Sequence, residues 1–174
     1  MIFETHAHYD DKMFDEDRES LLESMQEAGI GRIVNIGADL ASTASSIALA
    51  EKYPFIYAAA GVHPSDAAQL NEHTFQWLSE QTAHEKVVAV GEIGLDYYWE
   101  KDPEVRANQR YWFRRQLNLA REKVLPVSIH SRDAAKDTLD IMRQEHAGTT
   151  GGIIHCFSSS YFIFYKFIHI IAFL

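Results

Sequence analysis

Two histidines separated by one residue, His6 and His8, end an apolar run near the start of the chain. Because the side chains of a β-strand alternate between its faces, both imidazoles would point the same way. Three further apolar runs end in residues of the same chemical kind, namely Glu92, His130 and His155. Imidazole and carboxylate groups are ligands for divalent metals, so the spacing indicates a metal site built at the ends of several strands.

Glu92 is the natural bridge between two ions, because a carboxylate has two oxygens around which histidines can divide. We expect His6 and His8 to hold one ion, and His130 and His155 to hold the other. Such ligands suit Zn²⁺, Mn²⁺ or Fe²⁺, whereas Mg²⁺ prefers more oxygen. The alternative is that some of these are ordinary surface or helix-facing residues, since the chain has nine histidines.

The bulk composition describes an ordinary globular protein. The 174 residues suffice for one domain with a sizeable core, and 47% are hydrophobic. A net charge of −9 argues against a protein that binds nucleic acid by basic charge alone, although bound cations could offset it locally. Cys156 is the single cysteine, which excludes an intrachain disulfide, and no signal peptide is visible. We therefore expect a cytoplasmic protein.

Apolar runs alternate with amphipathic stretches along the chain. We expect strands at residues 2–6, 32–37, 55–61, 87–92, 125–130 and 151–155. We expect helices at residues 16–29, 42–53, 71–83, 104–124 and 133–145. This alternation is typical of α/β proteins with parallel strands, and a TIM-type (β/α) barrel gathers its site residues at the carboxyl ends of its strands.

The segment at residues 159–174 has a different composition. It is apolar on both faces, and Lys166 and His169 are its only strongly polar side chains. It is shorter than the roughly 20 residues that span a bilayer, so we expect no stable membrane association. Its bias toward Phe, Ile, Tyr and Lys is what AT-rich DNA read out of frame would encode. We therefore interpret residues 1–158 as the domain and residues 159–174 as a foreign tail.

Five segments together resemble the TatD family of metal-dependent hydrolases, within the amidohydrolase-like barrel superfamily. They lie at residues 4–8, 61–64, 91–97, 126–132 and 155–158, and the run at 91–97, Gly-Glu-Ile-Gly-Leu-Asp-Tyr, is the most discriminating. The resemblance implies a barrel with a two-ion site of Mg²⁺, Mn²⁺ or Zn²⁺, in which Glu92 is the bridge. Two neighbouring ions can activate a water and stabilise both the attacking and the leaving oxygen.

The same resemblance implies hydrolysis of phosphodiester bonds in DNA, or in RNA, by a 3′-to-5′ exonuclease acting on single strands. It implies that His63 and Arg132 lie near the substrate phosphate, to which an arginine can bind bidentately. Arg132 could instead form a salt bridge with Asp133 or Asp137, and His63 could cap the loop at Pro64.

Three aromatic residues, Tyr97, Tyr98 and Trp99, follow the Glu92 segment. Exposed rings at this position could stack on unpaired bases, and the alternative is ordinary packing against the next helix. Asp96, directly before them, could orient a histidine ligand.

The chain departs from the family pattern in several places. Glu4 stands where the family usually has Asp, and Ser159 where it usually has Gly. The resemblance also implies a late aspartate that completes the shell of the first metal, yet no Asp follows Asp140. We therefore expect an incomplete barrel of about six of the eight usual strands, with trace nuclease activity at most. The alternatives are a non-catalytic fragment or metal-binding partner, or a hydrolase of another ester or an amide.

Overall fold

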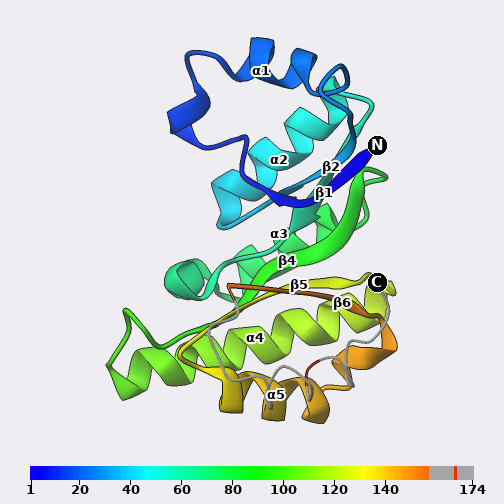
Figure 1. Ribbon diagram of the computed structural model, residues 1–174. Helices are drawn as coiled ribbons and strands as arrows, with labels where there is room; N and C mark the ends of the chain where they lie inside the picture. Colours follow the sequence, from blue (N-terminus) through cyan, green and yellow to red (C-terminus); the bar gives the residue numbers. More distant parts are fainter. Residues whose placement is uncertain (157–166, 168–174) are drawn as a thin grey trace.

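The computed structural model describes residues 1–156 and Phe167. Within these residues, six parallel strands form one sheet whose spatial order follows the sequence order. The strands are β1 (Ile2–Ala7), β2 (Ile30–Ile36), β3 (Ile56–Ala60), β4 (Val87–Asp96), β5 (Val127–Arg132) and β6 (Gly152–His155). The sheet curls between α1 and α2 beside its first strands and α4 and α5 beside its last (Figure 1). Within the described residues, the predicted TIM-type arrangement with six strands is thereby confirmed.

Helices connect successive strands, as expected of βα units. The α-helices are α1 (Arg18–Ser24), α2 (Leu40–Lys52), α3 (Glu72–Gln81), α4 (Pro103–Lys123) and α5 (Ala135–Gln144). Short 3₁₀ helices are η1 (Lys12–Phe14), η2 (Pro64–Gln69) and η3 (Ala147–Thr149). The side chains of Asp39, Asn71 and Asp102 accept backbone N–H groups where α2, α3 and α4 begin, which satisfies donors that a helix start leaves unpaired.

The first helix is shorter than the sequence predicts. It ends at Ser24, and Met25 N–H donates to the Leu22 carbonyl in a tighter turn. Ile30 N–H then donates to the Met25 carbonyl at 2.9 Å, and Gly29 adopts a φ of +88° between them. Gly29 therefore ends this segment, because it tolerates the left-handed conformation, but the residues before it form turns rather than helix.

The core lies mainly between the sheet and the helices. Ile33, Ile56 and Leu78 belong to a buried cluster under α2 and α3. Phe113 and Ile129 belong to a second cluster under α4 and α5. A smaller third cluster of Val34, Ile36 and Ala59 lies on the opposite face of the sheet, because neighbouring strand residues point to opposite sides. These layers hold the strand ends at fixed positions.

Strand β4 is longer than predicted, since it continues through Asp96 rather than ending at Glu92. Its pairing with β5 shifts register between Val90 and Ile93, as at a β-bulge, and Glu92 N–H instead donates to the Gly37 carbonyl at 2.7 Å. Glu92 therefore lies within the strand and is buried. Bulges re-aim side chains next to active sites, which accounts for the position of this carboxylate.

The apolar segment at residues 159–174 lies outside the described residues, apart from Phe167. Phe167 is buried in the second core cluster. Among the helices that the structure describes, none is long and apolar enough to cross a membrane. The division of the chain at residue 158 stays a prediction.

Candidate metal centre

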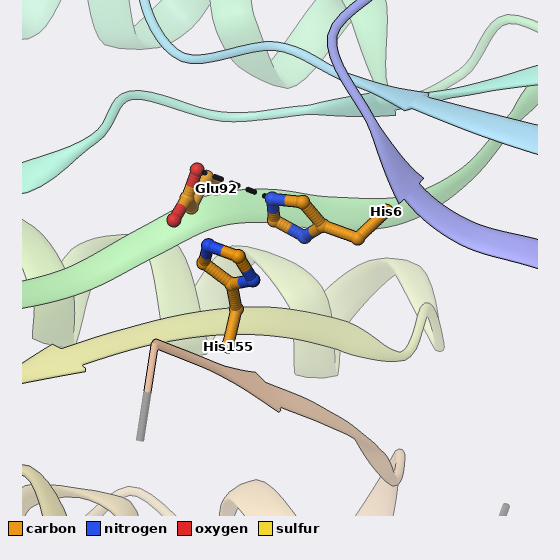
Figure 2. A group of neighbouring side chains, drawn as sticks. All are labelled: His6, Glu92 and His155. Carbon is orange, nitrogen blue, oxygen red and sulfur yellow. Dashed lines mark ion pairs between the residues drawn. The ribbon is translucent and has the colours of Figure 1, made fainter. Parts of the chain in front are cut away.

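The side chains predicted to bind metal come together at the carboxyl ends of the strands. His6 belongs to β1, Glu92 to β4, His130 to β5 and His155 to β6, while His8 follows β1 directly. Figure 2 shows the side chains of His6, Glu92 and His155 pointing toward one another from three strands. Residues up to 149 positions apart in sequence are thus neighbours in space, as ligands of one centre must be.

The two carboxylate oxygens of Glu92 face two different groups of histidines. Glu92 Oε2 lies 3.5 Å from His6 Nε2 and 3.6 Å from His8 Nε2, and these two nitrogens are 3.2 Å apart. Glu92 Oε1 lies 3.0 Å from His130 Nδ1 and 4.0 Å from His63 Nε2. This arrangement has the form of a carboxylate that could bridge two cations.

His155 lies on the His6 side of the centre. The two rings stack with centroids 3.9 Å apart and an interplanar angle of 5°, whereas the centroids of His155 and His130 are 6.2 Å apart. His6, Glu92 and His155 each offer a ligand atom within 4.8 Å of the other two, as do His63, Glu92 and His130. This grouping differs from the predicted division, which pairs His155 with His130. The division of ligands between ions stays a prediction.

Hydrogen bonds orient three of the imidazoles. The Ile36 carbonyl accepts from His8 Nδ1 at 3.0 Å, so Nε2 is the ring nitrogen that faces Glu92. The Asp96 carboxylate accepts from His130 Nε2 at 3.1 Å, which turns Nδ1 toward Glu92. His6 Nδ1 lies 3.1 Å from Ser128 Oγ, which likewise leaves Nε2 for the centre. Such partners fix the tautomer and direction of histidine ligands, and the role suggested for Asp96 agrees with this geometry.

The electrostatics of the centre follow from Glu92. Burial alone would raise its pKa, but hydrogen bonds with His130, His6 and His8 outweigh burial and hold the pKa well below the usual range. The hydrogen bond with Glu92 raises the pKa of His8, and burial lowers the pKa of His155. Glu92 is therefore an anion at neutral pH, surrounded by imidazole nitrogens. This donor set fits a divalent cation of the Zn²⁺ or Mn²⁺ type.

His63 caps the loop and also faces the centre, so the two roles left open by the sequence are compatible. Its Nδ1 accepts the Ser65 N–H at 3.2 Å, so the neutral ring carries its proton on Nε2, which is the atom facing Glu92. Burial lowers the pKa of His63 to about 4, so the ring is neutral at pH 7. A protonated Nε2 donates hydrogen bonds but cannot bind metal, and this favours contact with a substrate oxygen.

Arg132, at the end of β5, does not form the salt bridge considered from the sequence. In the described part of the chain, no ion pair joins it to Asp133 or Asp137, and Asp137 accepts instead from the Tyr97 hydroxyl at 2.8 Å. The Arg132 guanidinium lies 4.0 Å from the centroid of the Tyr98 ring. Its contact with a phosphate stays a prediction.

Two buried amide side chains that support the centre were not predicted from the sequence. Gln116 in α4 accepts from the Val62 N–H at 2.8 Å and donates to the Val62 carbonyl at 3.1 Å, which holds the residue before His63. Asn35 in β2 accepts the Tyr9 N–H at 2.6 Å, directly after His8. The available signal was an amide within an apolar run for Asn35 and an amide on the apolar face of a helix for Gln116, because such groups are buried only with partners.

The contacts of Asn35 predict a large loss of stability on substitution. Asn35 also donates to Asp10 Oδ1 at 2.7 Å and to Ser46 Oγ at 2.8 Å, and it is fully buried. Replacing Asn35 with alanine leaves these partners unsatisfied, so we expect the free energy of unfolding to fall by about 2–4 kcal/mol in urea denaturation. Asn118→Ala, at a partly exposed asparagine on α4, serves as control and should cost under about 1 kcal/mol. Equal losses would contradict the anchoring role of Asn35.

A curled parallel sheet with histidines and a carboxylate at its carboxyl ends is the arrangement of (β/α)-barrel metal-dependent hydrolases. Comparison with protein families agrees, since the model of the TatD related DNase family matches residues 3–173. The chain belongs to this family. The family expected from the sequence is thereby confirmed.

Individual relatives support the same assignment. The chain is 44% identical over 160 residues to the uncharacterized metal-dependent hydrolase YabD of Bacillus subtilis, covering 92% of this chain and 62% of that protein. It is 31% identical over 159 residues to the 3'-5' ssDNA/RNA exonuclease TatD of Cronobacter sakazakii, covering 91% of this chain and 60% of that protein. The crystal structure of YjjV, a TatD homologue from Escherichia coli, superposes with a TM-score of 0.88 at 33% identity, covering 97% of this chain and 65% of that one. The chain therefore spans about three fifths of the length of the curated relatives.

Proposed function

We propose that the chain carries the metal centre of a hydrolase that cleaves phosphodiester bonds of DNA, from the 3′ end of single strands. The observation that supports this proposal is the position of Glu92, whose two oxygens face His6 and His8 on one side and His130 on the other. The relative from Cronobacter sakazakii is named as an exonuclease on single-stranded DNA and RNA, which favours a nucleic-acid substrate over another ester or an amide.

The proposed centre holds two divalent ions, with His6, His8, His130 and His155 as nitrogen ligands and Glu92 between them. When bound, such ions activate water as a nucleophile and stabilise charge on the phosphate oxygens. The nitrogen-rich donor set favours Zn²⁺ or Mn²⁺ over Mg²⁺. The contribution of the chain itself is the anionic Glu92, together with the hydrogen bonds that aim each imidazole.

His63 and Arg132 are the proposed contacts to the substrate phosphate. The proton on His63 Nε2 points toward Glu92, where a nonbridging phosphate oxygen could accept it. Arg132 is the last residue of β5, two positions after His130, and it places a positive charge at the same edge of the sheet. Neutral His63 would then donate a hydrogen bond to the phosphodiester, and cationic Arg132 would offset part of its negative charge.

Metal analysis and a nuclease assay on one preparation test the proposal. Protein reconstituted with Mn²⁺ and freed of excess metal is expected to retain about two ions per chain by mass spectrometry. It should also release mononucleotides from the 3′ end of a single strand labelled at its 5′ end, at a rate above that of an EDTA-treated sample. His73→Ala, at an exposed histidine on α3, is the matched control and should leave the ion count unchanged. Ions without nucleotide release would support the non-catalytic alternative, and no retained ion would contradict the proposal.

A further inference from the structure

Two aromatic side chains beside the metal centre are exposed. Tyr97 is buried, with its hydroxyl donating to Asp137, so it packs as an ordinary core residue. Tyr98 is 44% exposed and Trp99 is 71% exposed, which makes Trp99 the most exposed Phe, Tyr or Trp side chain among the described residues. The sequence left two roles open for these rings, stacking on bases or packing in the protein. Tyr97 is packed, whereas Trp99 is exposed and available for stacking.

The exposed rings form an ordered cluster with Arg132. The ring centroids of Tyr98 and Trp99 are 4.6 Å apart with an interplanar angle of 88°. The Arg132 guanidinium lies 4.0 Å from the Tyr98 centroid and 5.5 Å from the Trp99 centroid, so one cation contacts both rings. Lys101 Nζ lies 6.0 Å from the Tyr98 centroid. We call Tyr98, Trp99 and Arg132 the aromatic platform.

Asp96 connects the aromatic platform to the metal centre. Its Oδ1 accepts the backbone N–H groups of Tyr98 at 2.9 Å and Trp99 at 3.3 Å. Its Oδ2 accepts from Nε2 of His130, whose Nδ1 faces Glu92. One buried carboxylate thus positions both the backbone of the platform and a candidate metal ligand. A group bound on the platform would lie next to whatever is bound at the centre.

We propose that the aromatic platform stacks an unpaired nucleobase of the strand whose phosphate lies at the metal centre. Aromatic rings and a guanidinium plane bind the flat face of any base, and neighbouring positive charge suits the strand that carries it. Bases inside a duplex are already stacked on one another and cannot offer this face. The platform therefore selects single strands over duplexes. This inference rests on the proposed function, since it presumes a nucleic-acid substrate.

Binding of two single strands that differ only in their bases tests the inference. One probe is a fluorescent oligothymidylate with a phosphorothioate backbone that resists cleavage, and the other is the abasic strand of the same length and backbone. The Mn²⁺-reconstituted protein is expected to bind oligothymidylate about tenfold more tightly than the abasic strand by fluorescence anisotropy. Trp99→Ala should weaken binding of oligothymidylate about five- to tenfold and leave abasic binding and the ion count unchanged.

Two further variants separate stacking from folding. Trp99→Phe keeps an aromatic face and should retain most of the preference for oligothymidylate. Tyr111→Leu removes an exposed ring on α4 that contacts Trp112 and Arg115 instead, and it should bind both probes as the unsubstituted protein does. Equal binding of the two probes, unchanged by Trp99→Ala, would overturn the platform and leave the nucleic-acid function standing. Binding of ions without either strand would overturn the nucleic-acid substrate, and the platform with it.

Discussion

Replacing Glu92 with glutamine is expected to weaken binding of divalent metal more than about 100-fold, because it removes the only carboxylate that faces both groups of histidines in the described structure. Glutamine has nearly the same shape but no negative charge, and its amide nitrogen is not a metal ligand. Loss of hydrolytic activity should accompany the loss of metal. Titration calorimetry of the EDTA-stripped protein with Mn²⁺ or Zn²⁺ measures the affinity directly.

Glu145→Gln is the matched control for this change. Glu145 is a partly buried carboxylate that pairs with Arg114 at 2.6 Å and accepts from Asn118 at 3.0 Å, on the outer side of the sheet. The same substitution there should leave metal affinity unchanged within about twofold, because no candidate ligand contacts it. If Glu92→Gln bound metal as tightly as the control, Glu92 could not be the bridging ligand.

Replacing Gly94 with alanine is expected to lower the free energy of unfolding by about 3 kcal/mol or more. Gly94 pairs with His130 between β4 and β5 and has a φ of +140°, a conformation that residues with side chains rarely adopt. A Cβ atom at this position would lie 2.1 Å from the His130 carbonyl oxygen. Either β4 must leave β5 or His130 must move away from Glu92, so metal affinity should also fall. Urea denaturation and metal titration measure the two effects.

Gly29→Ala separates backbone conformation from steric contact. Gly29 also has a positive φ, of +88°, but a Cβ atom there would meet nothing within 4 Å. Its replacement should cost only the conformational penalty of about 1–2 kcal/mol and should leave metal affinity unchanged. Equal costs at Gly29 and Gly94 would show that the close approach of β4 to β5 does not limit stability.

Much of the fold could be predicted because its signals are local. Alternating apolar runs and amphipathic stretches mark the strands and helices. The end of α1 and the length of β4 could not be predicted. Turns at residues 25–29 and the bulge near Glu92 depend on backbone partners elsewhere in the fold, such as the Gly37 carbonyl. Residue types nearby in sequence carry little information about such partners.

The candidate site, like the fold, could be predicted only in part. The types and spacing of His6, His8, Glu92, His130 and His155 by themselves indicated metal chemistry, because each residue follows an apolar run of strand type. Which imidazole nitrogen faces the centre was beyond the sequence, because the Ile36 carbonyl and Asp96 decide it through contacts across the fold.

The sequence by itself determined the family, the barrel type and the set of candidate ligands, since motifs and periodicity are properties of the chain. Only the tertiary structure decided that Glu92 faces both groups of histidines, that His63 points a proton at the centre, and that Trp99 is exposed beside Arg132. The physical reason is that hydrogen-bond geometry and exposure arise from strands and loops that are distant in sequence. Spacing along a chain can place ligands on one edge of a sheet, but only packing sets their directions.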